Sequence, residues 1–216
     1  MKQFAVIGCG RFGSSVAKTL HKSGFDVLAL DDDECAIRNI ADHVTHAATV
    51  DIDDANALKE VGIRNVDVVI VGIGSDLKAS IMATLLVKEM GVKYVVAKAQ
   101  DEMHAKVLKK IGADRVIFPE RDMGIRLAYN LTATNILDFI ELSKDYSIME
   151  IVAPQKWCGK SLKENNVRAR FGLSILAVKH GEEVNVSPEA DELILEEDIL
   201  IVVGSNEDLK KVQDFA

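Results

Sequence analysis

A glycine-rich segment near the start of the chain has the spacing of a phosphate-binding loop. The segment GCGRFG at 8–13 directly follows the apolar run FAVIG at 4–8 and precedes a stretch whose apolar residues have helical spacing. In such a loop Gly8 permits the tight turn, Gly10 lets a pyrophosphate approach the backbone, and Gly13 lets the helix pack closely on the strand. The helix N-terminus adds unpaired N–H groups and a partial positive charge. The segment therefore predicts a nucleotide site.

An acidic cluster follows the next apolar run, where a ribose would be bound. Asp31 ends the run DVLALD, and Asp32 and Asp33 come directly after it. A carboxylate at this position accepts hydrogen bonds from the ribose hydroxyls of an adenosine. The extra negative charge would repel a 2′-phosphate, which disfavours NADP. A glycine turn that serves packing alone is the plain alternative, but a strand, loop, helix and acid in this order favour a nucleotide.

Further residues follow the later predicted strands at the same edge of the sheet. Asp51 ends the third strand, the loop at 72–74 follows the fourth, Lys98 ends the fifth and Glu120 follows the sixth. Ligands of open α/β sheets bind at the carboxyl ends of the strands. We expect Asp51 and the 72–74 loop to flank the adenine and ribose. Arg11 lies inside the glycine loop, and its guanidinium suits phosphate oxygens.

Two interpretations of Glu120 are open at this point. A carboxylate close to a polyphosphate is repelled unless a cation lies between them. Alternatively, an acid in the first turn of a helix is stabilised by the helix dipole.

The elements that position these residues alternate along the first part of the chain. Near-continuous Val and Ile runs, separated by helical stretches, predict a parallel sheet covered on both faces. The predicted strands are 4–8, 26–31, 44–51, 67–73, 94–99 and 115–119, and helices are expected at 54–61, 77–90 and 102–111. This pattern predicts an α/β, Rossmann-like, doubly wound domain over residues 1–119.

The pattern changes after Pro119. Residues 120–135 have the spacing of a helix, and we assign 120–140 to a crossover helix and linker. Short strands separated by turns follow, in the runs IMEIVA, LSILAVK, EVNV and DILIVVG. Residues 141–216 are therefore expected to form a small α+β domain.

The composition excludes several classes of protein. The 216 residues have a formal net charge of −8, which argues against a nucleic-acid partner because the phosphate backbone demands a basic surface. No apolar run approaches the roughly 20 residues that cross a bilayer. The N-terminal segment lacks a cleavage site and is not expected to be a signal peptide. Three widely spaced cysteines fit neither a disulfide framework nor a metal knuckle, so we expect the reducing cytoplasm.

The chain shows no recognisable catalytic machinery. Its five histidines are scattered, none stands in a nucleophile motif, and the GxxxxGK[ST] pattern of phosphoryl transfer is missing. Residues 141–216 leave little room for the second domain of a dehydrogenase. A nucleotide site without such groups favours sensing over catalysis. A small NAD-dependent oxidoreductase subunit and an adaptor that regulates some other protein remain as alternatives.

Several segments together resemble the RCK regulatory subunits of bacterial Ktr and Trk potassium uptake systems. They are FAVIGCGRFG, VVIVGIGSD, KAQDEMHAKVLKKIGADRVIFPERDMG and NVRARFGLSILAVKHGEEVNVSP, and the likeness covers essentially the whole chain. It favours the Ktr type, which has one N-lobe and one C-lobe. The resemblance implies a cytoplasmic subunit, held at the inner face of the cell membrane by a membrane-embedded potassium-translocating partner. It also implies dimers, four of which form an octameric ring.

The resemblance further implies ligands and site residues. ATP activates, ADP competes with it, and NAD or NADH can occupy the same cleft. The γ-phosphate end would be surrounded by Lys98, Glu120 and Arg121, with Glu120 coordinating a divalent cation, Mg or Ca. The role of Asp32 stays open. The expected N-lobe site is Gly8, Gly10, Arg11, Phe12, Gly13, Asp31, Asp32, Asp51, Ile52, Ile73, Gly74, Lys98, Glu120 and Arg121.

A basic island interrupts the acidic last domain. Residues 141–216 have a net charge of −6, yet a short stretch holds five of their nine basic residues: Lys156, Lys160, Lys163, Arg168 and Arg170. Arginines on a solvated surface are the plain interpretation, but a local positive patch also suits a small anion. The resemblance supplies a candidate, cyclic di-AMP, bound between two protomers as an inhibitor. Its expected site is Asn166, Arg168, Ala169, Arg170, Ile175, His180 and Pro188.

The crossover helix and the residues after it carry more apolar side chains than one domain needs. They are Ile125, Leu127, Leu131, Ile136 and Leu137. This surplus predicts a closed homo-oligomer, with packing of the helix on its own sheet as the plain alternative.

Overall fold

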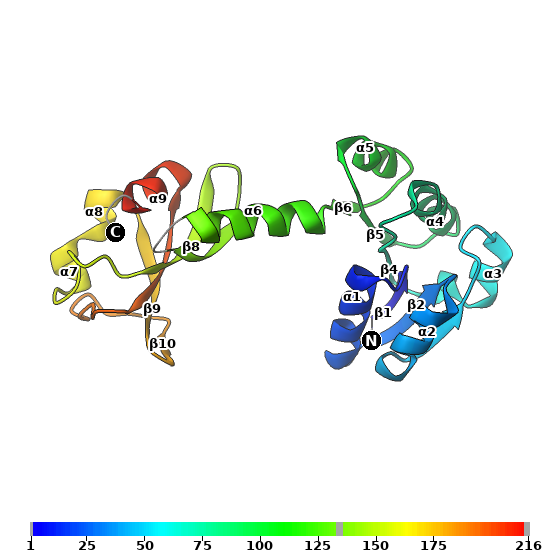
Figure 1. Ribbon diagram of the computed structural model, residues 1–216, viewed down its shortest axis with the longest axis horizontal. Helices are drawn as coiled ribbons and strands as arrows, with labels where there is room; N and C mark the ends of the chain where they lie inside the picture. Colours follow the sequence, from blue (N-terminus) through cyan, green and yellow to red (C-terminus); the bar gives the residue numbers. More distant parts are fainter. Residues whose placement is uncertain (1, 133–135, 214–216) are drawn as a thin grey trace. The chain divides into compact units, whose positions relative to one another are not determined.

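The computed structural model describes residues 2–132 and 136–213, which form two compact units (Figure 1). The N-terminal unit is Met1–Pro119 and the C-terminal unit is Glu120–Ala216. Each unit has its own sheet and its own hydrophobic core.

Six parallel strands build the N-terminal unit, in the order β3-β2-β1-β4-β5-β6. The strands are β1 (Gln3–Ile7), β2 (Asp26–Asp31), β3 (His46–Thr49), β4 (Val68–Val71), β5 (Tyr94–Lys98) and β6 (Arg115–Ile117). This is the Rossmann order, in which the direction of winding reverses between β1 and β4. The predicted doubly wound α/β fold is therefore confirmed.

Helices cover the two faces of this sheet. Along β1 the side chains alternate: Val6 packs with α1 and α2, and Ile7 packs with α3, α4 and α5. The helices are α1 (Arg11–Lys22), α2 (Glu34–Ile40), α3 (Ala55–Glu60), α4 (Leu77–Glu89) and α5 (Glu102–Lys110), with short 3₁₀ turns η1 (Ala41–His43) and η2 (Ile63–Asn65). Because both faces are covered, the strands are apolar on both sides, which explains their continuous Val and Ile runs.

Helix α1 begins differently from the others in the N-terminal unit. Asp33, Asp54, Asp76 and Asp101 each accept a backbone N–H in the first turn of the helix that follows, as N-cap residues do. The N-cap of α1 is Gly10, which has no side chain to offer, and the first turn contains no acid. The start of α1 therefore keeps backbone N–H groups available for an anion.

The C-terminal unit is a five-stranded antiparallel sheet with helices. Its strand order is β10-β9-β11-β8-β7. The strands are β7 (Ile136–Glu141), β8 (Tyr146–Val152), β9 (Ser174–His180), β10 (Glu183–Asn185) and β11 (Ile199–Ser205), and the helices are α6 (Pro119–Thr132), α7 (Leu162–Asn165), α8 (Val167–Phe171) and α9 (Asn206–Gln213). Burial alternates along β8 and β11, so one face of the sheet carries the core. No helix in the described ranges is both long and apolar enough to cross a bilayer.

One part of the predicted crossover segment is a strand. Residues 136–141, most of which the sequence analysis placed in a linker, form β7 and pair antiparallel with β8. Phe139 packs on the core of the unit, and Arg126 of α6 donates from Nε to Asp138 Oδ1 at 2.6 Å. These contacts join α6 to the sheet, so the prediction of a linker up to residue 140 is wrong. The end of the predicted helix, at 133–135, lies outside the described residues.

Candidate functional site

A cleft of about 320 Å³ lies at the carboxyl ends of β1, β2 and β4. This is the point where the winding of the sheet reverses, at which doubly wound folds bind their ligands. Seven residues of the predicted site line the cleft: Gly8, Gly10, Asp31, Asp32, Ile52, Ile73 and Gly74. The loop and the acid that the sequence singled out thus meet in one cavity.

The glycine loop has a conformation that two of its glycines make possible. Gly8 has a φ of +89°, which disfavours any residue with a side chain. A Cβ on Gly13 would overlap the carbonyl oxygen of Gly8, so this glycine lets α1 approach β1 closely. Gly13 is buried and does not line the cleft. Its role in the structure is packing, whereas Gly10 faces the cleft.

Asp31 holds the glycine loop to the end of β2. Only 8% of the residue is exposed. Its Oδ2 accepts a hydrogen bond from the backbone N–H of Cys9, and its Oδ1 accepts one from Asp33 at 2.9 Å. A carboxylate has about four acceptor positions. Asp31 can therefore organise the loop and still accept hydrogen bonds from ribose hydroxyls.

The cleft is acidic around Asp31. Asp32, Asp33 and Asp76 also line it. A hydrogen bond between the side chains of Asp31 and Asp32, with partial burial and the charge of Asp31, raises the pKa of Asp32 above its ordinary value. This clustering of negative charge repels a phosphate group here. A bound nucleotide would therefore direct its phosphates toward the start of α1.

Cys9 lies inside the loop but is not a reactive thiol. It is buried, and its Sγ donates to the carbonyl oxygen of Leu30 at 3.5 Å. Burial, followed by the negative charge of Asp31, raises the pKa of the Cys9 thiol to about 12. The thiolate needed for nucleophilic chemistry is accordingly disfavoured at neutral pH.

Lys98 lies beside the loop that follows β4. The Nζ of Lys98 is 5.8 Å from the centroid of the Phe12 ring. A Cβ added to Gly74 would lie 2.9 Å from the same Nζ. The side chain of Gln100 donates to the carbonyl oxygen of Gly74. Arg11 is exposed at the first position of α1. Of the predicted set, Arg11 and Phe12 belong to the glycine loop and Lys98 lies beside the 72–74 loop, but none of the three lines the cleft.

Asp51 does not end a strand. Strand β3 stops at Thr49, and Asp51 forms a turn in which its Oδ1 accepts the N–H of Asp53 at 3.0 Å. The predicted third strand, which ended at Asp51, is therefore two residues too long, because β3 already ends at Thr49. Asp51 is exposed outside the lining of the cleft, whereas its neighbour Ile52 is buried and lines it.

Glu120 and Arg121 open α6 in the C-terminal unit. They follow β6 in the chain, and the Nε of Arg121 lies 3.2 Å from Asp122 Oδ1. Within 2–132 and 136–213, no cluster of three or more His, Cys, Asp or Glu side chains is arranged to hold a metal ion.

Three polar residues of the cleft were not in the predicted set, although Asp33 was placed in the acidic cluster beside Asp31. Asp33, Ser75 and Asp76 line it in addition to the predicted set. Asp76 accepts the N–H of Ala79 at 2.9 Å and so caps α4. An acid at the N-cap of the helix that follows a strand at the ligand edge is a signal that could have placed Asp76 at the site.

A second cavity, of about 470 Å³, lies in the C-terminal unit. Four residues of the predicted second site line it: Asn166, Arg168, Ile175 and Pro188. Asn166 has a φ of +46° and forms the junction between α7 and α8. Three other predicted residues, Ala169, Arg170 and His180, do not line this cavity. The guanidinium of Arg170 lies over the Phe171 ring, at 5.4 Å from its centroid.

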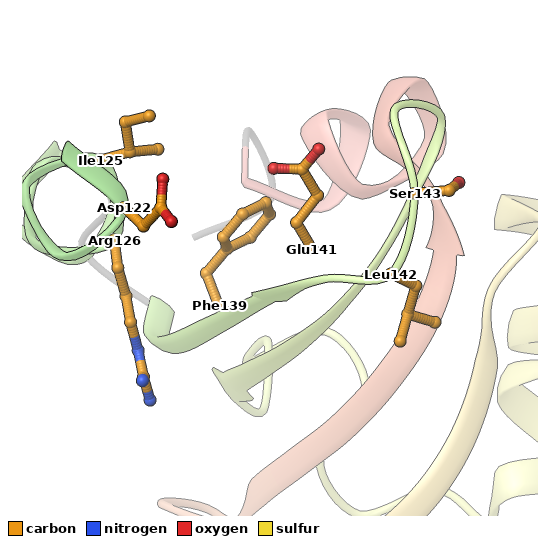
Figure 2. Close-up of a pocket in the computed structure, with 7 residues that line it drawn as sticks. All are labelled: Asp122, Ile125, Arg126, Phe139, Glu141, Leu142 and Ser143. Atoms are coloured by element: carbon orange, nitrogen blue, oxygen red, sulfur yellow. The ribbon is translucent and has the colours of Figure 1, made fainter. Parts of the chain in front are cut away.

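A third hollow, of about 370 Å³, lies between α6 and β7 (Figure 2). Figure 2 shows the ring of Phe139 rising from β7 between the side chain of Glu141 and α6, from which Ile125 and Asp122 project. Ile125 and Leu142 are exposed at its rim. The hollow was not predicted as a ligand site, and its exposed apolar side chains suit protein contact better than a nucleotide.

Two family models match the chain. The TrkA-N domain model matches residues 4–119, and the TrkA-C domain model matches residues 147–216.

Curated relatives match along nearly the whole chain. Ktr system potassium uptake protein C of Bacillus subtilis is 48% identical over 212 residues, which are 98% of this chain and 96% of the relative. Ktr system potassium uptake protein A of the same organism is 45% identical, over 99% and 96% of the two chains. Ktr system potassium uptake protein A of Vibrio alginolyticus is 40% identical, over 96% of this chain and 94% of the relative.

Solved structures share the fold. A GsuK channel bound to NAD superposes with a TM-score of 0.69 at 17% identity, over 99% of this chain and 39% of the channel. The crystal structure of the GsuK RCK domain gives 0.54 at 24% identity, over 99% and 46%. This chain thus spans less than half the length of these two structures. The resemblance seen in the sequence is confirmed: the chain belongs to the RCK-domain regulatory subunits of Ktr potassium uptake systems.

Proposed function

We propose that this chain senses nucleotides and gates potassium uptake through a membrane-embedded translocating subunit, without being an enzyme. The observation that carries the proposal is the cleft at the carboxyl ends of β1, β2 and β4, where the uncapped start of α1 lies beside Asp31. The chain would act in the cytoplasm, at the inner face of the membrane. The names of its relatives, which are potassium uptake proteins, support the transport role.

The proposed ligands of the cleft are ATP and ADP. The ribose would bind Asp31, and the adenine would lie near Ile52. Gly8, Gly10, Arg11 and Phe12 would surround the phosphates at the positive end of α1, and Gly13 would let that helix start close to β1. NAD or NADH could bind the same loop, and one structural neighbour carries NAD.

ATP and ADP differ only in the γ-phosphate and the cation that accompanies it. A ligand shifts a conformational equilibrium only by its different affinity for the two states. We therefore assign the discrimination to Arg11, Lys98, Glu120 and Arg121, with a Mg or Ca ion on Glu120, whereas Asp31 serves both ligands. Asp51 keeps at most an outer role on the adenine side, because it is exposed outside the lining of the cleft.

The proposed second ligand, in the C-terminal unit, is cyclic di-AMP. Arg168 would contact its phosphates, and Ile175 and Pro188 would pack on a purine ring. A ligand with two-fold symmetry suits a dimer in which each chain contributes the same residues. Binding there would close potassium uptake.

Nucleotide titration of the full chain tests the proposal. We expect heat of binding with ATP and with ADP. We expect Arg11→Gln to weaken the binding of ATP more than the binding of ADP. Lys22→Gln, at the other end of α1, is the matched control and should leave both affinities unchanged. Glu120→Gln should flatten the dependence of ATP binding on the concentration of divalent cation. Equal losses for ATP and ADP in Arg11→Gln would refute its assigned role.

A second measurement separates sensing from catalysis. Phosphate release from ATP and oxidation of NADH are followed with the same protein. Either reaction at about 1 per second or faster, the range of ordinary enzymes, would refute the proposal that the chain is not an enzyme, and turnover of NADH would favour the oxidoreductase alternative.

A further inference from the structure

The ring of His180 lies between two carboxylates in the C-terminal unit. His180 ends β9, Asp198 directly precedes β11, and Glu192 lies in the segment between β10 and β11. Nδ1 of His180 is 2.7 Å from Asp198 Oδ1, and Nε2 is 3.3 Å from Glu192 Oε1. Only 4% of the Asp198 side chain and 17% of the Glu192 side chain are exposed. The ring therefore joins two largely buried acids.

This arrangement favours a protonated ring. A neutral imidazole has one N–H, so it can donate to only one of the two carboxylates, and its bare nitrogen would face the other. Asp198 and Glu192 are the charged groups that act on the ring within the described part of the chain. The hydrogen bond to Asp198, then the one to Glu192 and the charges of both, raise the pKa of His180 against the opposing effect of burial.

Glu192 in turn anchors the segment 186–192. Its Oε2 accepts a hydrogen bond from the side-chain amide of Asn185 at 2.6 Å, and Asn185 Oδ1 accepts the N–H of Ser187 at 3.1 Å. The backbone carbonyl of Glu192 accepts the N–H of Leu162 at 3.0 Å. Through Glu192, the ring of His180 is therefore connected to both ends of this segment.

The segment 186–192 forms part of the wall of the second cavity. Pro188 and Ala190 line that cavity together with Arg168. The N–H of Lys163 donates to the carbonyl oxygen of Ala190 at 2.8 Å, which connects this wall to α7. The shape of the cavity thus depends on the position of a segment that His180 helps to hold, although His180 does not line the cavity.

We propose that His180 is a positioning residue whose protonated ring holds segment 186–192 as a wall of the second cavity, so that a phosphodiester-linked purine ligand binds more weakly as the pH rises. The proposal rests on the ligand class proposed above for this cavity. Below the ordinary pKa of histidine, about 6.5, both hydrogen bonds of the ring are present. As the pH rises through the higher value in the folded chain, the bond to Glu192 is lost. Inhibition of uptake would then be relieved at high pH.

The experiment is calorimetric titration of the full chain with cyclic di-AMP at about pH 6 and about pH 8.5. We expect the wild type to bind roughly threefold to tenfold more weakly at the higher pH, the effect of losing one hydrogen bond. His180→Gln should bind with the same affinity at both pH values. His43→Gln, an exposed histidine of the N-terminal unit, is the control and should keep the wild-type pH dependence. Glu192→Gln should also remove the pH dependence of binding. This variant replaces His180→Gln if the latter does not fold.

Two outcomes would overturn the proposal. One is a pH dependence that is the same in wild type, His180→Gln and Glu192→Gln. The other is unchanged protection of segment 186–192 in the ligand-free chain, and it becomes the deciding measurement if cyclic di-AMP binds at neither pH, because that result removes the proposed ligand but not the positioning role. Amide hydrogen exchange of the ligand-free full chain then decides. Protection of 187–192, corrected for the chemical rate, should fall at the higher pH in the wild type only, and unchanged protection would refute the role of His180.

Discussion

At the scale of single residues, we expect alanine substitutions at two glycines of the same loop to have opposite effects on stability and on nucleotide binding. Gly13→Ala places a methyl group against the Gly8 carbonyl, so α1 must move away from β1. We expect the free energy of unfolding to fall by about 1–3 kcal/mol, the usual effect of overpacking. Gly10→Ala meets no heavy atom within 4 Å and keeps a φ of −64°, which alanine tolerates. We expect this variant to retain wild-type stability but to bind nucleotide more weakly, because its methyl group enters the cleft.

Thermal unfolding and nucleotide titration of both variants separate packing from ligand approach. A stable Gly10→Ala chain with unchanged nucleotide affinity would show that phosphates do not pass close to this backbone.

Asp31 and Asp51 show how far residue roles can be predicted from the sequence. Asp31 directly ends an apolar run, so its place at the cleft follows from the strand itself. Asp31 also accepts hydrogen bonds from the backbone N–H groups of Cys9 and Asp33. This second role depends on how the loop folds back, so residue spacing does not predict it. Asp51 was misplaced because its own side chain forms a turn and ends β3 two residues earlier.

At the scale of elements, the helical wall of the second cavity begins at a capping box. Ser161 Oγ accepts the N–H of Glu164 at 3.2 Å, and the Glu164 carboxylate accepts the N–H of Ser161 at 2.8 Å. We expect Ser161→Ala to destabilise the C-terminal unit by about 1 kcal/mol, the usual effect of removing a helix cap. Thermal unfolding checks this, and Ser161→Thr should retain most of the stability because it keeps the acceptor.

The same cap implies that the stability of the C-terminal unit depends on pH. The backbone N–H and the hydroxyl of Ser161 lower the pKa of Glu164 below its ordinary value. A lowered carboxyl pKa means that the stabilisation is present at neutral pH and is lost as the pH falls below about 4. Glu164→Gln should therefore be less stable than the wild type at pH near 7 and equally stable in acid, by thermal unfolding. A constant difference across this range would contradict the assignment.

The elements of the N-terminal unit were easier to predict than those of the C-terminal unit. Buried parallel strands give continuous apolar runs, and aspartate caps mark where helices begin. Strand β7 was missed because it lies at a sheet edge and follows the apolar α6 closely, so periodicity did not separate the two. Helices α7 and α8 have four and five residues, which is too short for a helical period to show.

At the scale of the whole molecule, α6 carries apolar side chains that its own unit leaves exposed. The exposed fractions of Leu127 and Leu131 are 54% and 76%, and Ile125 on the same helix is also exposed, as is Leu137 of β7. The side chain of Ile136, which the sequence grouped with them, lies outside the described residues. Exposed apolar surface of this extent along a single helix is typical of a contact between chains. An octameric ring of dimers, which the resemblance implies, would provide such a contact.

We therefore expect Leu127→Glu to lower the mass of the particle in light scattering at micromolar concentration. A charge in the centre of an apolar interface costs at least about 2 kcal/mol, which is roughly a thirtyfold weaker association. Because Leu127 is exposed in the single chain, the variant should fold as well as the wild type, and circular dichroism checks this. Leu176→Glu, an equally large exposed side chain on β9, is the matched control and should keep the wild-type mass. If Leu127→Glu keeps the full mass while folding normally, the contact between chains must lie elsewhere than on α6.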